Sequence, residues 1–192
     1  NIKPSEKILE DAKGNLSYSV WPSLSKNKNL MIFIHGTGAH KKWWYPIAPQ
    51  FVNYSNVIAV DLPGMGDSGF REKYSIKDFG QCIISIINKE KSNIDIDNIS
   101  IIGHSLGGQV AGYVASEEKN LVSNLIMIDT FIRPPDWDPS QNEGGPLRMI
   151  KYYPDKTTIL KRFRLLPQQE CNNEWFVRYI SEHSVRETSE GW

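Results

Sequence analysis

Short apolar runs alternate with stretches of helical periodicity along the first two thirds of this chain. The apolar runs lie at residues 16–21, 30–34, 57–60, 99–102 and 125–128, and the helical stretches lie at 43–52, 75–88 and 105–116. The last four runs are apolar except for Ser100, which is typical of strands buried on both faces of a parallel sheet. This alternation predicts an α/β fold with a doubly wound, mostly parallel sheet and helices on its faces.

The pattern changes after Asp129. Residues 134–139 read Pro-Pro-Asp-Trp-Asp-Pro, a turn-rich break, and helices are predicted beyond it near 157–166 and 174–184. We therefore expect two parts, a core over residues 1–131 and a helical lid over residues 132–192. A continuation of the sheet is the alternative interpretation, but no apolar run of comparable strength occurs there.

The sequence Gly-His-Ser-Leu-Gly-Gly at residues 103–108 follows one of the apolar runs and precedes a helical stretch. A strand, a tight turn and a helix in this order hold a serine in a strained backbone conformation, with its hydroxyl above the sheet edge. Gly103 and Gly107 let the flanking backbone pass close to Ser105. Ser105 is therefore the candidate nucleophile.

A second glycine-containing turn, at residues 35–38, follows the run at 30–34. Ligands of open α/β sheets bind beyond the carboxyl ends of the strands, where both turns lie. The backbone N–H groups of Thr37 and Leu106 are expected to form an oxyanion hole, in which each donor is typically worth about 3 to 4 kcal/mol in the transition state. The alternative is a plain turn between a strand and a helix.

A third turn, at residues 61–69, reads Asp-Leu-Pro-Gly-Met-Gly-Asp-Ser-Gly and follows the run at 57–60. Aspartate in such turns accepts hydrogen bonds from nearby backbone N–H groups. We expect Asp61 and Asp67 to do so, which gives this loop a structural role.

The three turns together resemble the α/β-hydrolase superfamily, over residues 16–130. Within it the chain is most similar to lid-bearing carboxylester hydrolases and to C–C hydrolases of meta-cleavage products. The resemblance implies the α/β-hydrolase type of sheet with a helical lid, a triad of serine, acid and histidine, and an acyl-enzyme. It implies no metal and no organic cofactor. Related dehalogenases and epoxide hydrolases carry aspartate at the nucleophile position, so a serine there favours an ester, thioester, lactone or activated ketone as the electrophile.

The acid of the implied triad has one candidate. Asp129 directly follows the run at 125–128, and if that run neighbours 99–102, the two strand ends lie about 5 Å apart. An acid later in the family's sequence order is the alternative. The resemblance places the base after the last strand, so we expect it, with the final core strands, beyond residue 192.

None of the four histidines matches the position of that base. His35 and His104 are expected to orient the turns in which they lie. His40, beside two lysines, is expected to be exposed, and His183 to be packed or half-buried on a lid helix. The missing base leaves a catalytically silent scaffold, used for ligand binding or protein interaction, as an alternative function.

Composition limits the partners. Lys+Arg and Asp+Glu number 22 each, so the balance favours neither nucleic acid nor an anionic membrane surface. Cys82 and Cys171 form no disulfide framework, and no apolar stretch approaches the roughly 20 residues of a membrane span. We expect a cytoplasmic protein that acts on a small molecule, and the sequence leaves its oligomeric state open.

Aromatic residues near the expected site indicate the kind of substrate. Trp43, after the second turn, and Trp137, in the lid, are the candidate substrate-binding residues, although aromatic residues at helical spacing are more often core. The main hypothesis is a serine hydrolase that cleaves a carboxylic ester of a small, largely apolar substrate. C–C cleavage is the alternative reaction, in which a basic lid residue would meet a substrate carboxylate; the candidates are Arg133, Arg148, Arg162 and Arg164.

Overall fold

A six-stranded sheet forms the centre of the first part of the chain. The computed structural model describes residues 2–132, 151–165 and 169–192, which divide into two compact units, Asn1–Phe131 (unit 1) and Ile132–Trp192 (unit 2). The strands all belong to unit 1: β1 (Ser5–Asp11), β2 (Gly14–Trp21), β3 (Asn29–Ile34), β4 (Asn56–Val60), β5 (Asn98–His104) and β6 (Asn124–Ile128).

The strands lie in the order β1-β2-β4-β3-β5-β6. β3 pairs in parallel with β4 and β5, and β5 with β6, whereas β1 and β2 run antiparallel to their neighbours. Ile34 is opposite both Val60 and Gly103, and His104 is opposite Ile128. The carboxyl ends of four strands are therefore level at one edge, and the mostly parallel sheet predicted from the apolar runs is confirmed.

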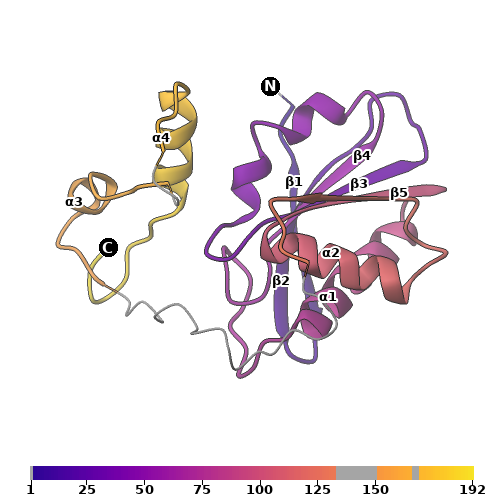
Figure 1. The fold of residues 1–192 in the computed structure, drawn as a ribbon, viewed down its shortest axis with the longest axis horizontal. Coiled ribbons are helices and arrows are strands. Elements are labelled where there is room, and N and C mark those ends of the chain that lie inside the picture. The colour runs from indigo at the N-terminus through magenta and orange to yellow at the C-terminus, as the bar shows by residue number, and fades with distance from the viewer. Residues whose placement is uncertain (1, 133–150, 166–168) are drawn as a thin grey trace. The chain divides into compact units, whose positions relative to one another are not determined.

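Helices cover both faces of this sheet. α1 (Ile76–Lys91) and α2 (Leu106–Glu117) lie on one face, and the 3-10 helices η1 (Lys41–Trp44) and η2 (Ala48–Phe51) lie on the other (Figure 1). Each face has its own apolar cluster, because side chains of a strand alternate between the two faces. Ile32 belongs to the larger cluster with α1 and α2, and its neighbour Phe33 packs on Trp44 of η1.

The start of α1 is set by Ser75. The Ser75 hydroxyl oxygen accepts the Asp78 N–H at 3.0 Å and donates to the Asp78 carboxylate at 2.6 Å, which satisfies one of the donors that a helix start leaves unpaired. Phe79, Ile83 and Ile86 then recur at helical spacing and are buried. The helix predicted at 75–88 is confirmed and runs to Lys91.

The helix predicted at 43–52 is wrong in form. The segment folds as η1 and η2, which leave residues 45–47 between them. Pro46 and Pro49 lack the backbone N–H that a continuous α-helix needs, and a proline ring clashes with the preceding turn. The chain therefore covers this face of the sheet with two short 3-10 helices in place of one α-helix.

The sheet has one strand more than the apolar runs indicate. β1 reads Ser-Glu-Lys-Ile-Leu-Glu-Asp and is largely exposed, so it lacks an apolar run. It forms a hairpin with β2, closed by Gly14 at φ +127°. Gly14, just before the alternating residues 16–20, is the signal that could have marked the hairpin.

The expectation that the run at 125–128 is buried on both faces is also wrong. Leu125, Ile126 and Ile128 are 40%, 48% and 42% exposed. In the described residues β6 is the outermost strand and pairs only with β5, so nothing covers its far side.

Unit 2 contains two helices among its described residues, α3 (Lys156–Leu160) and α4 (Glu174–His183). Asp155 caps α3 by accepting the Thr158 N–H at 2.8 Å. The helix predicted at 174–184 agrees with α4, whereas the one predicted at 157–166 ends early, at Leu160. Tyr153 and Trp192 exchange two backbone hydrogen bonds of 2.9 Å, so the segments before α3 and after α4 lie side by side.

The contact between α1 and α2 generates a testable prediction. A Cβ atom on Gly80 of α1 would lie 2.2 Å from Tyr113 Cδ1 of α2, whereas one on Gly112 would meet only Met127 Cε, at 3.7 Å. Alanine is favoured over glycine in a helix by about 1 kcal/mol, but overpacking costs about 1–3 kcal/mol. We expect Gly80→Ala to lower the free energy of unfolding by up to about 2 kcal/mol and Gly112→Ala to raise it by up to about 1 kcal/mol.

Urea denaturation of both variants measures this difference. A Gly80→Ala protein as stable as the Gly112→Ala protein would show that the two helices can separate at no cost.

Candidate active site

Ser105 lies between β5 and α2 in a left-handed backbone conformation, with φ 52° and ψ −118°. A residue with a side chain adopts such a conformation at a cost of about 1–3 kcal/mol, so its surroundings must hold it there. The Ser105 N–H donates to the Ile128 carbonyl at 3.0 Å, and the Ser105 carbonyl accepts the Gly108 N–H at 3.0 Å. The serine is thus fixed from β6 on one side and from the first turn of α2 on the other.

The glycines around Ser105 are required by close packing of the backbone. A Cβ atom on Gly103 would lie 2.2 Å from the Gly107 carbonyl oxygen, and one on Gly107 would lie 2.4 Å from the Ile34 carbonyl oxygen. Both distances are far below van der Waals contact. The start of α2 therefore packs directly against the end of β3.

The turn at residues 35–38 lies beside Ser105. A Cβ atom on Gly36 would be 3.1 Å from Ser105 Cβ and 2.8 Å from His104 Nδ1. Thr37 and Gly38 are exposed, and the turn is closed by a hydrogen bond of 3.2 Å from the Ala39 N–H to the Gly36 carbonyl. The structure brings this turn and the candidate nucleophile together.

Leu106 is the first residue of α2. Backbone N–H groups in the first turn of a helix have no acceptor within the helix and carry its positive dipole end. They are suited to bind an oxygen that gains negative charge next to Ser105. Thr37 and Leu106 thus flank the serine from two different elements.

His35 is buried and holds the turn at 35–38 against the loop after β4. Its Nδ1 lies 2.8 Å from the Gly36 carbonyl, and its Nε2 accepts the Leu62 N–H at 3.1 Å. Burial lowers the pKa of His35 from its ordinary 6.5, and the Gly36 carbonyl and Asp61 only partly oppose this. His35 is therefore neutral, with the proton on Nδ1, and both ring nitrogens are occupied within the loops.

Asp129 follows β6 directly, next to Ser105 on the neighbouring strand end, because His104 and Ile128 are paired. It is exposed, and its φ is +46°. The Thr130 hydroxyl donates to the carbonyls of Ser105 and Ile128 at 3.3 and 3.1 Å, which ties the turn to the start of α2. The structure thus brings Asp129 to the edge where Ser105 lies, although no described residue hydrogen-bonds its carboxylate.

The histidines do not complete a triad within the described residues. His183 is exposed on α4 of unit 2, and its Nδ1 lies 2.8 Å from the Tyr179 carbonyl, so the expectation that it is half-buried is wrong. Its ring packs on the Tyr179 ring, with the ring centroids 4.3 Å apart. His104 lies against Gly36. No histidine is hydrogen-bonded to the Ser105 hydroxyl in the part of the chain that the structure describes.

The expectation that His40 is exposed is also wrong. His40 and the adjacent Lys41 are 7% and 1% exposed. The Lys41 ammonium donates to Ser17 Oγ at 2.7 Å and to carboxylate oxygens of Asp61 and Asp67 at 3.0 Å each. Burial lowers the pKa of Lys41, but the two aspartates outweigh it and leave the pKa raised, so the lysine is charged.

Asp61 accepts backbone N–H groups as predicted, whereas the Asp67 carboxylate accepts the Lys41 ammonium. Asp61 accepts the backbone N–H of Lys41 at 2.6 Å and that of Asp67 at 2.9 Å. The ion pair with Lys41 was missed, because residues 41 and 61 are far apart in sequence and a Lys-Lys pair indicates an exposed position. The position of both residues, shortly after neighbouring strands, is the signal that could have found it.

The family described as alpha/beta hydrolase fold matches residues 29–178, most of the chain. The chain belongs to the α/β-hydrolase fold family. The predicted α/β-hydrolase type of sheet is confirmed by this match and by the solved structures described below, whereas the helical lid stays a prediction.

Two curated relatives of this α/β-hydrolase chain carry hydrolase names. A pimeloyl-[acyl-carrier protein] methyl ester esterase of Pseudoalteromonas atlantica is 31% identical over 128 residues, which cover 62% of this chain and 46% of that protein. A soluble epoxide hydrolase of Corynebacterium sp. is 30% identical over 104 residues, which cover 52% of this chain and 34% of that protein. The matched part thus spans less than half the length of both relatives.

Solved structures agree on the fold. A thioesterase domain from the curacin biosynthetic pathway superposes with a TM-score of 0.76 at 21% identity, over 98% of this chain and 68% of that one. The epoxide hydrolase CorEH superposes with a TM-score of 0.61 at 23% identity, over 71% of this chain and 47% of that one. At these identities the likeness shows the α/β-hydrolase fold alone.

Of the two aromatic residues predicted to bind substrate, Trp43 lies within the described residues. Trp43 is half-buried in η1, and its indole N–H is buried without a hydrogen-bond partner among the described residues. Trp137 lies outside the described residues, as do Arg133 and Arg148. Arg162 lies over the Tyr153 ring, with its guanidinium carbon 5.6 Å from the ring centroid.

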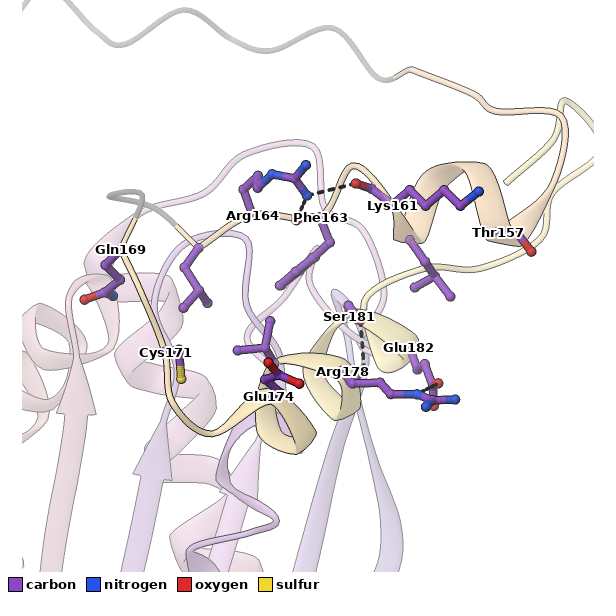
Figure 2. Close-up of a pocket in the computed structure, with 13 residues that line it drawn as sticks. Thr157, Lys161, Phe163, Arg164, Gln169, Cys171, Glu174, Arg178, Ser181 and Glu182 are labelled. Atoms are coloured by element: carbon purple, nitrogen blue, oxygen red, sulfur yellow. Dashed lines mark hydrogen bonds and ion pairs between the residues drawn. The ribbon is translucent and has the colours of Figure 1, made fainter.

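Unit 2 of this α/β hydrolase contains a cavity of about 560 Å³ between α3, α4 and the segment that joins them (Figure 2). Apolar side chains such as Leu160, Phe163 and Val177 line it together with charged ones. Arg164 donates to the carbonyls of Lys161 and Phe163 at 2.8 and 2.6 Å, and Arg178 to Glu182 at 2.9 Å. The arginines drawn in Figure 2 are thus engaged within the unit.

The described residues contain no group of three or more His, Cys, Asp or Glu side chains placed to hold a metal ion. Among the described helices, none combines the length and hydropathy that a transmembrane span requires.

The burial of His35 predicts how stability depends on pH. In the unfolded chain His35 takes up a proton near pH 6.5, whereas the folded α/β hydrolase takes it up only at lower pH. The stability that neutral His35 contributes is therefore complete above pH 6.5 and is lost as the pH falls through the interval between the two pKa values. We expect a slope of up to about 1.4 kcal/mol per pH unit from this one proton.

Urea unfolding between pH 7.5 and 5 measures this slope. The His35→Asn variant removes the titrating ring and keeps an amide near the Gly36 carbonyl, so its stability should depend less steeply on pH. Equal slopes for the two proteins would show that His35 is not held neutral.

Proposed function

We propose that this chain is a serine hydrolase that cleaves a carboxylic ester of a small, largely apolar substrate through an acyl-enzyme on Ser105. One observation carries the proposal: Ser105 is held at φ 52° at the sheet edge, with the Gly36 turn packed against its Cβ atom. Strained backbone of this kind marks functional sites, and the nucleophile elbow is its form in α/β hydrolases. The ester bond named in the Pseudoalteromonas atlantica relative supports the substrate class.

Each group has a role in the proposed reaction. The Ser105 hydroxyl oxygen attacks the ester carbonyl carbon, and the carbonyl oxygen becomes an oxyanion that the Thr37 and Leu106 N–H groups bind. The alcohol leaves, and water then releases the acid from Ser105. Asp129 is the proposed acid of the triad. The base that takes the serine proton is a histidine other than His35, whose two ring nitrogens are both occupied.

The substrate side of the proposal rests on aromatic residues and on unit 2. Trp43 follows the oxyanion turn and is half-buried, so the accessible part of its indole ring is proposed as an apolar wall. Unit 2 is proposed to act as a lid, and Trp137 is proposed as a substrate-binding residue. C–C cleavage has less support among the described residues, because Arg164 and Arg178 beside the cavity of unit 2 bond carbonyls and Glu182.

A fluorophosphonate probe, which reacts with activated serines, tests the nucleophile. We expect one adduct per protein molecule, located on Ser105 by peptide mass spectrometry, and none on the Ser105→Ala variant. Ser116→Ala is the matched control, because Ser116 lies on the same helix and only bonds the Tyr113 carbonyl. A wild-type chain that takes no label would contradict the proposal and favour a silent scaffold.

Asp129→Asn tests the acid. If Asp129 orients the base, its amide holds the wrong tautomer and the rate of labelling should fall by on the order of 10²–10⁴-fold. The folded state should survive, because Asp129 is exposed. An unchanged labelling rate would assign the acid to another residue.

A further inference from the structure

We infer that Lys41 is a positioning residue for the oxyanion hole: through Asp61 it fixes the turn at 35–38 without touching the substrate. The inference deepens the proposed function and rests on it. The buried ammonium group of Lys41 connects three segments of the chain next to that turn. These segments are β2, the loop that follows β3 and the loop that follows β4.

The ammonium group is fully coordinated. Its three N–H donors match three oxygens, those of Ser17 on β2 and of Asp61 and Asp67 in the loop after β4. Glu6 on β1 approaches to 3.5 Å as a further carboxylate. A compact ammonium can point its donors in three directions, whereas the planar guanidinium of arginine cannot reproduce this arrangement. The site is therefore specific for lysine.

Asp61 fixes the main chain of Lys41 as well as its side chain. One carboxylate oxygen accepts the Lys41 backbone N–H at 2.6 Å, and the other accepts the ammonium group at 3.0 Å. Asp61 is itself fixed, because its own N–H donates to the Ser17 carbonyl at 2.9 Å. A Cβ atom on Gly66 would lie 2.2 Å from the Asp61 carboxylate carbon, so the loop closes tightly around it.

These contacts leave the turn held at both ends. At its start, Ile34 is paired with β4 and β5, and at its end Lys41 is fixed by Asp61. Only residues 35–40 lie between the two anchors, and Gly36 lies against Ser105 in that interval. A donor that binds the oxyanion must be held within about 0.5 Å, and misplacement by 1 Å can cost about 100-fold in rate.

Burying an ion pair costs free energy, so we expect a loop to be held in this way where its exact position matters. Replacing a buried pair by apolar residues is often neutral or stabilising, whereas removal of one partner leaves a buried charge. Lys7 supplies the comparison. It makes two hydrogen bonds of 2.9 and 2.8 Å to the buried Glu90, in the same unit but with no contact to residues 35–40 among the described interactions.

The test compares Lys41→Met with Lys7→Met in the otherwise unchanged protein. The rate constant and the binding constant for fluorophosphonate labelling are measured separately, and hydrogen exchange of the amides at 36–40 is followed by mass spectrometry. For Lys41→Met we expect the labelling rate constant to fall by about 10–100-fold, a nearly unchanged binding constant, and faster exchange at 36–40 with α1 still protected. Lys7→Met should lose stability and keep both labelling constants.

A folded Lys41→Met protein that labels at the wild-type rate overturns the inference, and so does an equal loss of rate in Lys7→Met. If Lys41→Met does not fold, Lys41→Arg carries the same test, because it keeps the charge and changes only the geometry. If the wild-type chain takes no label, the proposed function fails, and exchange decides about Lys41 alone. Unchanged exchange at 36–40 in either Lys41 variant would then show that Lys41 does not fix the turn.

Discussion

The register of β3 between β4 and β5 is the constraint on which the rest of the site depends. Because Ile34 is opposite both Val60 and Gly103, three turns leave the sheet at the same level. The start of α2 can then pack against the end of β3, where only glycine fits at position 107. A slip of one residue in β3 would move its side chains to the opposite face and separate the Gly36 turn from Ser105.

The site concentrates backbone strain at the ends of two neighbouring strands. Ser105 after β5 and Asp129 after β6 both have positive φ values. Each such residue opposes folding, and the hydrogen bonds from Thr130 and the packing of α2 compensate for it. The apolar clusters on the two sheet faces supply the stability that this arrangement consumes.

The parts of the fold that sequence patterns could predict are those governed by local rules. Apolar runs defined the central strands, and Ser75 together with apolar spacing defined α1. β1 was not predicted, because four of its seven residues are charged and it lies at an exposed edge. Residues 43–52 were predicted as one helix, but Pro46 and Pro49 override helical spacing there and short 3-10 helices form. Prediction from local patterns fails where a distant partner decides the structure.

The candidate site also combines features that follow from local sequence with features that depend on distant residues. Ser105 and the two glycine turns are defined by short motifs, so their places at the sheet edge were predictable. The burial of Lys41 depends on Asp61 and Asp67, and the exposure of β6 depends on which strand lies at the edge of the sheet. Neither can be read from the few residues around it, because both are properties of the assembled sheet.

One hydrogen bond has a consequence for how this protein would lose function. The Ser105 N–H is held by the Ile128 carbonyl of β6, which in the described residues is bound along one side only. Strands with few buried contacts open in local fluctuations well before the whole domain unfolds. Displacement of β6 from β5 would therefore release the strained serine while the pairs of β3 with β4 and β5 stay in place.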